Sequence, residues 1–386
     1  MDKTKQTIAA VFEEISQGII SGSFGGRVRV ALTLDGSEHG AAEMLRGATL
    51  AQSADSSIEV VVIGERVETN LTLIEAADQK AAHEIMDKML LSGELDAAVT
   101  MHYNFPIGVA TIGRVVTPGF GRKMFVGSTT GTSDTDRVCA MLKNAIGSIA
   151  AAKACKIPAP TVGILNIDGA RQLERALRSL QENGYPINFT QSARADGGVV
   201  MRGNDLLQGV PDVMVMDSLT GNVIMKAMSA FMTGGSYESI GDGYGPGVGE
   251  GYDRIINIIS RASGAPVVAG AISYAGALAG GELLKKVAAE FALAKKAGLS
   301  EILDSLAKSG EKSKDSGDDD IKPPPEKVVT EEIAGIEILE LENAVRVLWK
   351  EGIFASSGMG CTGPIILVAP EDKEAANDAI KKAGYL

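Results

Sequence analysis

Cys361 is the residue of this sequence whose setting best suits covalent chemistry. It lies in "ASSGMGCTGPIILVAP" (355–370), directly between Gly360 and Thr362, with Gly363 next. A thiol reacts as its thiolate, so it needs nearby positive charge or backbone N–H groups, and a glycine-rich turn can present such groups to an anion. Gly360, Thr362 and Gly363 therefore form a candidate oxyanion turn around a nucleophile. A tight hairpin whose cysteine is incidental is the alternative.

The other two cysteines have a different setting. Cys139 in "DRVCAMLKNAI" and Cys155 in "AAAKACKI" lie in apolar helical patterns, which are typical of small buried side chains. Three widely spaced cysteines without a C-x-x-C pair argue against a disulfide framework and against a thiolate zinc site. The pattern favours a reducing, cytoplasmic compartment.

A second candidate site lies in "DSLTGNVIMKAMSAFM" (217–232). A strand is expected to end at Asp217, and a helix is expected to follow it. The turn between a strand and the N-terminus of the next helix is a common anion pocket in open α/β sheets. The residues that could bind phosphate there are Asp217, Thr220, Gly221, Asn222 and Lys226. The spacing does not fit a Walker A loop, and simple capping of the helix by Ser218 or Thr220 is the alternative.

His39 in "LDGSEHGAAE" and His102 in "TMHYNFPIG" each follow a predicted strand, so either could carry a proton at the sheet edge. Ordinary hydrogen-bonded histidines remain the alternative. No metal site is expected, because the three histidines lie in unrelated segments without a carboxylate cluster. The glycine-rich stretch 234–254 only weakly matches a nucleotide fingerprint, and it is interpreted as a flexible lid or a partner-binding loop.

The composition limits the possible partners. The 386 residues are 45% hydrophobic and 22% charged, which is typical of a globular protein. A net charge of −12 and scattered basic residues argue against a nucleic-acid partner. The longest uncharged run, 264–281, barely reaches the length that a bilayer requires, so no stable membrane insertion is expected. An acidic protein that handles phosphate needs local basic residues at its site.

Short apolar strands alternate with amphipathic helices along most of the chain. Strands are predicted at 27–34, 58–64, 96–101, 161–167 and 212–218, and helices at 37–54, 75–93, 136–154 and 170–184. Strands that are apolar on both faces and separated by helices indicate a mostly parallel sheet between two helix layers. The fold class is therefore predicted to be a three-layer α/β/α sandwich.

Four segments are predicted. Residues 1–26 form an N-terminal helical arm, and 27–281 form the α/β body. Residues 282–345 form a helical insertion that contains a charged, Pro-rich, disordered linker at 308–327. Residues 346–386 then return to the body and carry Cys361.

Two blocks of sequence resemble the phosphate acyltransferases, relatives of phosphotransacetylase that form acyl phosphates for phospholipid synthesis. These blocks are "PTVGILNIDGARQLERALRSLQENG" and "GNDLLQGVPDVMVMDSLTGNVIMKAM". The resemblance covers most of 27–281 and 352–383, and it implies a fold like that of isocitrate and isopropylmalate dehydrogenases. Two family loops differ here. "DAMGGD" is replaced by "LDGSEHG" with His39, and "GNTGA" by "YNFPIG" with Asn104. Both loops are expected near the acyl or phosphate site.

The cysteine and the inserted segment resemble one branch of this group over essentially the full chain. That branch is the alpha subunits of glycine reductase component C, which form acetyl phosphate in Stickland fermentation. The resemblance implies that Cys361 carries an acetyl thioester, which inorganic phosphate releases without a further cofactor. It also implies a ketoacyl-synthase-like beta subunit and the selenoprotein component A as partners. The beta subunit could contact 282–345 or 234–251.

The sequence therefore predicts an acyltransferase that acts with inorganic phosphate in a glycine, sarcosine or betaine reductase complex. Two other functions remain open. One is a stand-alone phosphate acyltransferase that uses thioesters of acyl carrier protein or coenzyme A. The other is a non-catalytic scaffold for the beta subunit. A dehydrogenase is less favoured, because the sequence lacks a credible nicotinamide motif and a shared fold does not fix function.

Overall fold

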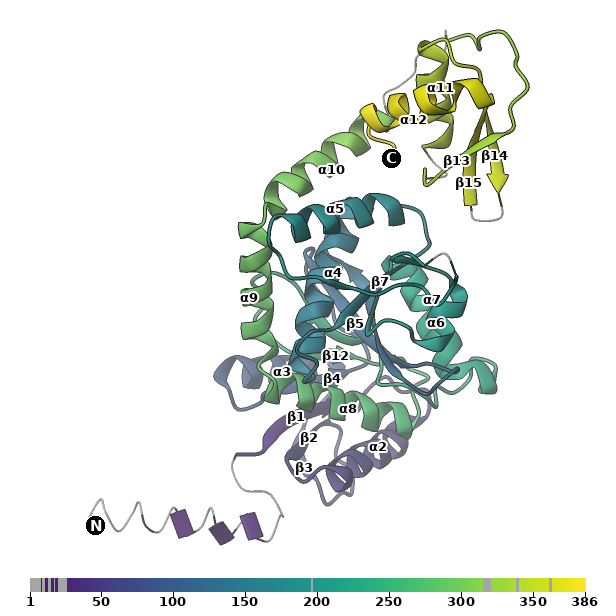
Figure 1. Ribbon diagram of the computed structural model, residues 1–386. Helices are drawn as coiled ribbons and strands as arrows, with labels where there is room; N and C mark the ends of the chain where they lie inside the picture. Colours follow the sequence, from purple (N-terminus) through teal and green to yellow (C-terminus); the bar gives the residue numbers. More distant parts are fainter. Residues whose placement is uncertain are drawn as a thin grey trace.

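A twelve-stranded sheet and a separate three-stranded sheet organise the chain in the computed structural model (Figure 1). The structure describes residues 8, 11–12, 15–16, 18–19, 26–195, 197–314, 321–337, 340–360 and 363–386. Most of the predicted arm 1–26 lies outside these residues. In the large sheet the strands follow the order β3-β2-β1-β4-β12-β11-β5-β6-β10-β7-β8, and β9 pairs with β7.

The strands of the large sheet are β1 (Val28–Thr33), β2 (Ile58–Gly64), β3 (Thr72–Glu75), β4 (Ala97–Thr100), β5 (Val109–Val116), β6 (Lys123–Thr132), β7 (Thr161–Leu165), β8 (Asn188–Phe189), β9 (Val200–Met201), β10 (Val213–Val215), β11 (Gly245–Val248) and β12 (Ile256–Ile258). The small sheet holds β13 (Glu331–Ala334), β14 (Ala355–Gly360) and β15 (Gly363–Val368).

The helices of the body are α2 (Gly40–Ala54), α3 (Gln79–Ser92), α4 (Arg137–Ala154), α5 (Ala170–Glu182), α6 (Gly203–Gln208), α7 (Ser218–Ala230), α8 (Ala265–Gly280), α9 (Leu283–Lys296) and α10 (Leu299–Lys314). The helices α11 (Leu341–Lys350) and α12 (Lys373–Lys382) accompany the small sheet. Short 3₁₀ turns occur at Phe231–Thr233 and Pro370–Asp372.

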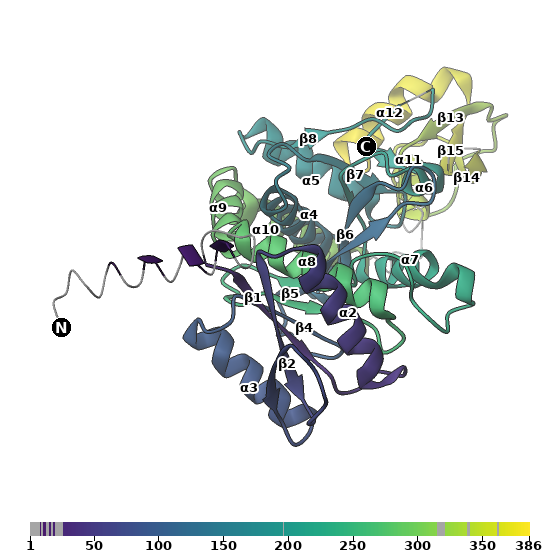
Figure 2. The ribbon, with the colours of Figure 1, turned by 90° about the horizontal axis from the view of Figure 1, so that it is seen from below.

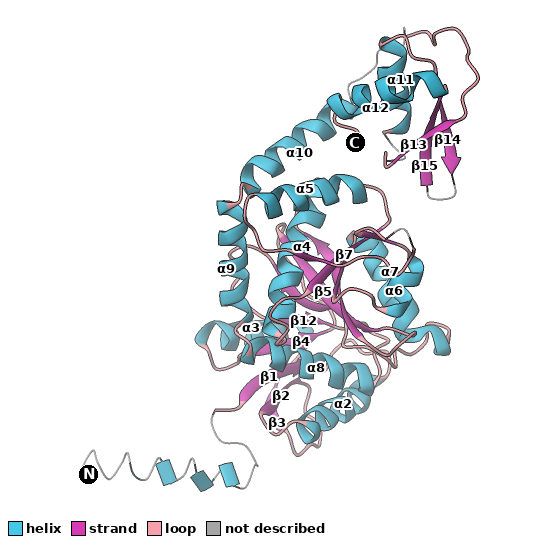
Figure 3. Cartoon of the chain, in the orientation of Figure 1, coloured by secondary structure: helices cyan, strands magenta, loops and turns pink. Residues whose placement is uncertain are grey.

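Helices cover both faces of the large sheet, which confirms the three-layer prediction (Figure 3). Successive side chains of a strand point to opposite faces. In β1, Val30 and Leu32 pack in the core cluster beneath α2, α4, α5 and α8, whereas Ala31 packs in a second cluster with α3. Figure 2 shows α2 and α3 on opposite sides of these strands. The strands β6 and β10 pack against α7 through a third cluster.

The sheet is mostly parallel, as predicted, but its two halves run in opposite directions. The strands β1, β2, β3, β4 and β12 are parallel to one another, and β6, β7, β8, β9 and β10 form a second parallel group. Antiparallel pairs join β12 to β11, β11 to β5, and β5 to β6. Three antiparallel steps reverse the direction, so the carboxyl ends of the two parallel groups lie at opposite edges of the sheet.

The segment 234–254 is not a surface lid, and that prediction is wrong. It contributes β11 to the middle of the sheet, and Glu238, Asp242 and Tyr244 are all at most 4% exposed. Its glycines allow close backbone packing. Gly245 has φ +84°, and a Cβ atom there would lie 1.7 Å from the carbonyl oxygen of Ile112 in β5.

Residues 346–386 do not return to the body. They join 331–337 and 340–345 in a separate C-terminal unit (331–337, 340–360 and 363–386), in which β13 and β14 both pair with β15. This unit has its own apolar core, which includes Ile333, Leu348, Ile366 and Ile380. The strand β13 was missed within the predicted helical insertion, because "EEIA" is too short and too charged to stand out.

The insertion is helical where α9 and α10 run, and α9 packs against α4. Lys153 and the hydroxyl of Tyr185 both contact the buried Glu290 of α9, at 2.6 and 2.8 Å. The predicted linker begins inside α10, its residues 315–320 lie outside the described residues, and 321–327 form no helix or strand. In Figure 1, α10 leads from the body to the C-terminal unit, which lies beyond α5.

No single helix among the described residues is long and apolar enough to span a membrane. The helices α8 and α9 pass that test only as a pair, and they are bent by 63° where they meet. In the structure, α8 packs between α2, β1 and β4.

Candidate functional site

Three helix N-termini meet at the carboxyl edge of β6, β7 and β10. The helix α4 follows β6, α5 follows β7, and α7 follows β10, and these three strands are neighbours in the sheet. A helix N-terminus carries unpaired N–H groups and a partial positive charge, so it favours anions. This convergence is therefore a candidate anion site, in which Asp136 already caps α4 and Asp217 already caps α7.

Arg137, the first residue of α4, adds a full positive charge to this edge. Its guanidinium group donates to a carboxylate oxygen of Asp168 at 2.8 Å and to one of Asp217 at 3.0 Å. The arginine side chain is 44% exposed, so one face of the group stays open to solvent. The two carboxylates fix its orientation, and the whole arrangement links the loops that precede α5 and α7.

Asp217 is the N-cap of α7, so this turn does cap a helix, but through Asp217 and not through Ser218 or Thr220, which the capping alternative had named. It accepts hydrogen bonds from the backbone N–H of Thr220 at 3.0 Å and from the Thr220 hydroxyl at 2.6 Å. Burial raises the pKa of Asp217, but the bonds from Thr220 and Arg137 outweigh burial and lower the pKa overall. Asp217 is therefore a fixed anion that orients Arg137 and Thr220.

Gly221 and Asn222 hold α7 against β6. A Cβ atom at Gly221 would lie 1.8 Å from the carbonyl oxygen of Ser128, so only glycine allows this approach. The Asn222 side-chain amide donates to the carbonyl oxygen of Thr129 at 3.1 Å. Both residues position the helix, and their described contacts do not place them on a ligand.

Lys226 does not join Arg137 at the sheet edge. It lies two turns into α7, is exposed, and its Nζ atom is 5.5 Å from the ring centroid of Tyr244. The cation nearest to Asp217 is therefore Arg137, which the sequence analysis missed. The strand β6 was not predicted, so nothing marked Arg137 as the first helical residue after a strand.

The structure does not place His39 and Asn104 with Asp217. His39 follows β1, whose carboxyl end lies at the edge opposite to that of β10. Its ring centroid is 5.0 Å from that of Tyr237, and its Nε2 atom is buried without a hydrogen-bond partner in the described structure. Asn104 is exposed in the loop between β4 and β5.

His83 is a histidine that the sequence analysis did not single out. Its Nε2 atom is 2.9 Å from the hydroxyl of Thr100, at the carboxyl end of β4. Burial lowers the pKa of His83, and the neighbouring His102 acts in the same direction. Within the described residues, no three His, Cys, Asp or Glu side chains lie where they could hold a metal ion.

Cys361 and Thr362 lie outside the described residues. The chain on either side is described, because Gly360 ends β14, Gly363 begins β15, and these two glycines are paired across the hairpin. The glycine turn therefore joins two antiparallel strands of the C-terminal unit. The roles predicted for Gly360, Cys361, Thr362 and Gly363 remain predictions.

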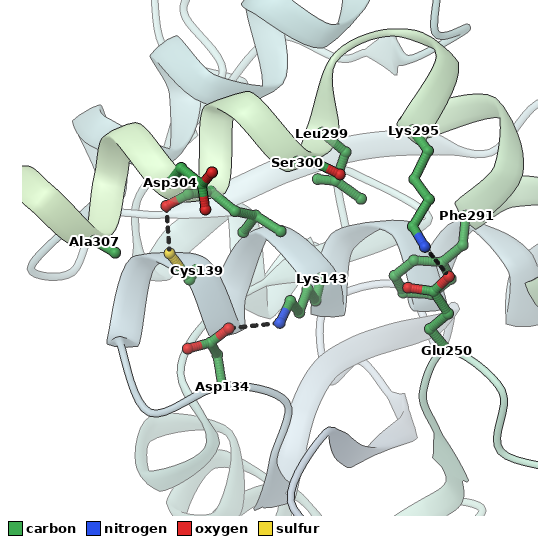
Figure 4. Close-up of a pocket in the computed structure, with 11 residues that line it drawn as sticks. Asp134, Cys139, Lys143, Glu250, Phe291, Lys295, Leu299, Ser300, Asp304 and Ala307 are labelled. Carbon is green, nitrogen blue, oxygen red and sulfur yellow. Dashed lines mark hydrogen bonds and ion pairs between the residues drawn. The ribbon is translucent and has the colours of Figure 1, made fainter.

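Cys139 borders a pocket of about 370 Å³ between α4, α9 and α10 (Figure 4). Burial, together with Asp136, raises the pKa of its thiol to about 12, so the thiolate is scarce at neutral pH. In the same pocket Lys143 is paired with Asp134, and Lys295 with Glu250. Burial also raises the pKa of Cys155. Both cysteines fit the structural role that the sequence predicted.

The comparisons with known proteins agree with the resemblance seen in the sequence. The chain is 53% identical over all 386 residues, and over 100% of both chains, to the glycine/sarcosine/betaine reductase complex component C subunit alpha of Peptoclostridium acidaminophilum. It is 28% identical over 196 residues to a phosphate acyltransferase of Bacillus cereus (strain G9842), which covers 46% of this chain and 57% of the relative.

A solved structure of a 4-hydroxythreonine-4-phosphate dehydrogenase from Salmonella typhimurium covers 66% of this chain and 100% of its own. Its sequence identity is 13% and its TM-score is 0.39, too low to carry an argument. The family described as "Fatty acid synthesis protein" matches residues 28–367. The chain therefore belongs to the fatty acid synthesis protein family, and within it resembles the component C alpha subunit along its whole length.

Proposed function

We propose that this protein transfers an acetyl group from a thioester on Cys361 to inorganic phosphate. The observation that carries the proposal is the convergence of the α4, α5 and α7 N-termini around Arg137. Helix N-termini and an arginine side chain both bind phosphate in proteins. The full-length similarity to a reductase component C alpha subunit supports the same assignment.

The proposed step balances without an oxidant or a cofactor. An oxygen of HPO₄²⁻ attacks the thioester carbonyl, a C–O bond forms, and the C–S bond breaks. The phosphate proton passes to the leaving sulfur, so the products are acetyl phosphate and the free thiol of Cys361. Holding phosphate beside the thioester lowers the entropic cost of the reaction, and a glycine turn can donate N–H groups to the tetrahedral oxyanion.

Each described residue of the site has a distinct part in this scheme. Arg137 would bind phosphate through the exposed part of its guanidinium group, while Asp168 and Asp217 hold that group in place. Gly221 and Asn222 fix the position of α7 on the sheet. We further propose that the protein works in a complex, with a beta subunit related to ketoacyl synthases and the selenoprotein component A as partners.

The proposal is tested by incubating the protein with acetyl phosphate that is radiolabelled in its acetyl group, and by then mapping the labelled peptide. The reverse reaction should transfer the labelled acetyl group to the cysteine. We expect label on the peptide that contains residue 361, and arsenate-dependent hydrolysis of acetyl phosphate by the protein. The Cys139→Ser variant should label normally. Label on any other peptide would refute the site.

The similarity to phosphate acyltransferases supports a second candidate, direct acyl transfer from acyl carrier protein or coenzyme A to phosphate. That enzyme would form no covalent acetyl intermediate, and it would tolerate Cys361→Ser. A scaffold without activity would show neither labelling nor arsenate-dependent hydrolysis. Labelling therefore separates the proposed function from the other two, and formation of acetyl phosphate from acetyl-coenzyme A and phosphate by the Cys361→Ser variant would separate the direct acyltransferase from the scaffold.

A further inference from the structure

A glutamate of the C-terminal unit caps the N-terminus of α5 in the body. The carboxylate of Glu337 accepts hydrogen bonds from the backbone N–H of Gly169 at 3.1 Å and from that of Arg171 at 2.5 Å. Glu337 is only 8% exposed. The next residue of α5, Gln172, donates through its side-chain amide to Glu340 of the same unit.

The helix α5 has no capping side chain of its own. Its N-cap is Gly169, at φ +84°, whereas α4 is capped by Asp136 and α7 by Asp217. The nearest acidic residue in sequence, Asp168, is paired with Arg137. The free N–H groups of α5 are therefore satisfied by a carboxylate that lies 168 residues further along the chain than Gly169.

The two units otherwise have separate cores. The C-terminal unit packs around residues such as Leu348 and Ile366, and the body packs around its own clusters. Between α10 and β13, residues 321–330 form no helix or strand. Domains joined in this way move relative to each other unless an interface fixes them. The bonds of Glu337 to α5 are such a fixing point.

We infer that Glu337 is a positioning residue, which docks the C-terminal unit beside the anion site so that the cysteine can meet phosphate. The inference rests on the proposed function. Glu337 accepts from the N–H of Gly169, and Gly169 directly follows Asp168. Glu337 is therefore held next to the hydrogen-bonded side chains of Asp168, Arg137 and Asp217. The unit that contains residue 361 is thereby kept at the edge of the sheet where phosphate would bind.

A distance measurement tests the docking without using any activity. Spin labels are placed at Glu182→Cys in α5 and Lys381→Cys in α12, both exposed positions, in a full-length background in which Cys139, Cys155 and Cys361 are replaced by serine. The unsubstituted protein should give one narrow distance distribution. Glu337→Gln and Glu337→Ala should broaden it toward longer distances, because a neutral or missing acceptor holds the two N–H groups less well.

Glu351→Gln is the matched control, since it removes the same charge from an exposed position of the same unit. It should leave the distribution narrow. Exchange of the Gly169 and Arg171 amide hydrogens should become at least about tenfold faster in Glu337→Gln and stay unchanged in Glu351→Gln. Equal distances in Glu337→Ala and the parent protein would overturn the docking.

Kinetics on the protein with Cys361 intact test the positioning role. For Glu337→Gln we expect kcat for arsenate-dependent hydrolysis of acetyl phosphate to fall about tenfold, with the KM for arsenate little changed. If the spin-label distances of Glu337→Gln broaden while its kcat stays unchanged, the positioning role is overturned and the proposed function still stands. Absence of label at residue 361 in the parent protein would instead refute the proposed function, and the distance measurement would still decide the docking.

Discussion

The body and the C-terminal unit divide the proposed reaction between them. The body offers the proposed anion site, where three helices begin after neighbouring strands and Arg137 is held by two aspartates. The C-terminal unit offers the cysteine, on a two-residue connection between β14 and β15. The body is built on twelve strands and the unit on three. The proposed binding site thus belongs to the larger core, and the proposed reactive group belongs to the smaller unit.

Because the two functions lie in separate units, a substitution in one unit should leave the function of the other unit intact. A change in the body should alter phosphate binding or overall stability, because its site residues also hold helices in place. A change in the C-terminal unit should alter the chemistry while leaving the body folded. The predictions below test whether that separation holds.

Replacing Cys361 with serine should have the largest effect. We expect arsenate-dependent hydrolysis of acetyl phosphate to fall by at least about 10³-fold, because removal of a nucleophile disables the covalent route. The melting temperature should stay unchanged, and Cys139→Ser should keep its activity. A serine variant as active as the parent protein would place the chemistry elsewhere, and the division between the two parts would fail.

Gly221→Ala should be the most damaging change for the stability of the body. The added methyl group would meet the Ser128 carbonyl oxygen at 1.8 Å, and a backbone atom cannot move aside cheaply. We expect the free energy of unfolding in urea to fall by about 3 kcal/mol. Gly203→Ala is the control, because a Cβ atom there would meet nothing within 4 Å. Equal stabilities for both variants would contradict the close packing of α7 on β6.

Arg137→Gln should weaken phosphate binding and have less effect on stability. The variant keeps a polar side chain but loses the charge between Asp168 and Asp217, so we expect the KM for arsenate to rise about tenfold. Arg66→Gln removes an equally positive but 85% exposed group and should change nothing. A KM that is unchanged in Arg137→Gln would remove the guanidinium group from the phosphate site.

The sequence predicted the part of the fold in which parallel strands alternate with helices. Strands such as β1, β2 and β7 appeared as short apolar runs between amphipathic helices, because burial on both faces leaves that pattern. The strands β5 and β6 were missed, since they form an antiparallel hairpin without an intervening helix. The reversal of direction that this hairpin produces is what separates His39 from Asp217.

The candidate site was predicted only where its residues are neighbours in sequence. Asp217, Thr220 and Asn222 lie within six consecutive residues at the start of α7, and the structure joins Asp217 to Thr220 directly. Arg137, Asp168 and Glu337 come from three distant segments, and only tertiary packing brings them to one edge. Glu337 had no local signal, because the helix that it caps lies in the other unit.

The pH dependence of docking should be the smallest of these effects. Burial raises the pKa of Glu340, and the neighbouring Glu337 and Asp168 raise it further, against the opposing influence of Arg175 and the bond from Gln172. The docked state therefore favours protonated Glu340. The contribution of Glu340 to docking should therefore be fully present at a pH below the ordinary pKa of a glutamate, and it should be lost as the pH rises through the raised pKa of Glu340. Tyr385 also faces this group, and its own raised pKa keeps it neutral over that range.

Glu340→Gln should remove this dependence, because the amide stays neutral at every pH in the range. The measurement is the spin-label distance between α5 and α12 over a pH series, with Glu351→Gln as the control. The parent protein and the control should broaden together as the pH rises, while Glu340→Gln stays narrow. If all three behave alike, Glu340 does not modulate docking, and the contact between the two units depends on Glu337 alone.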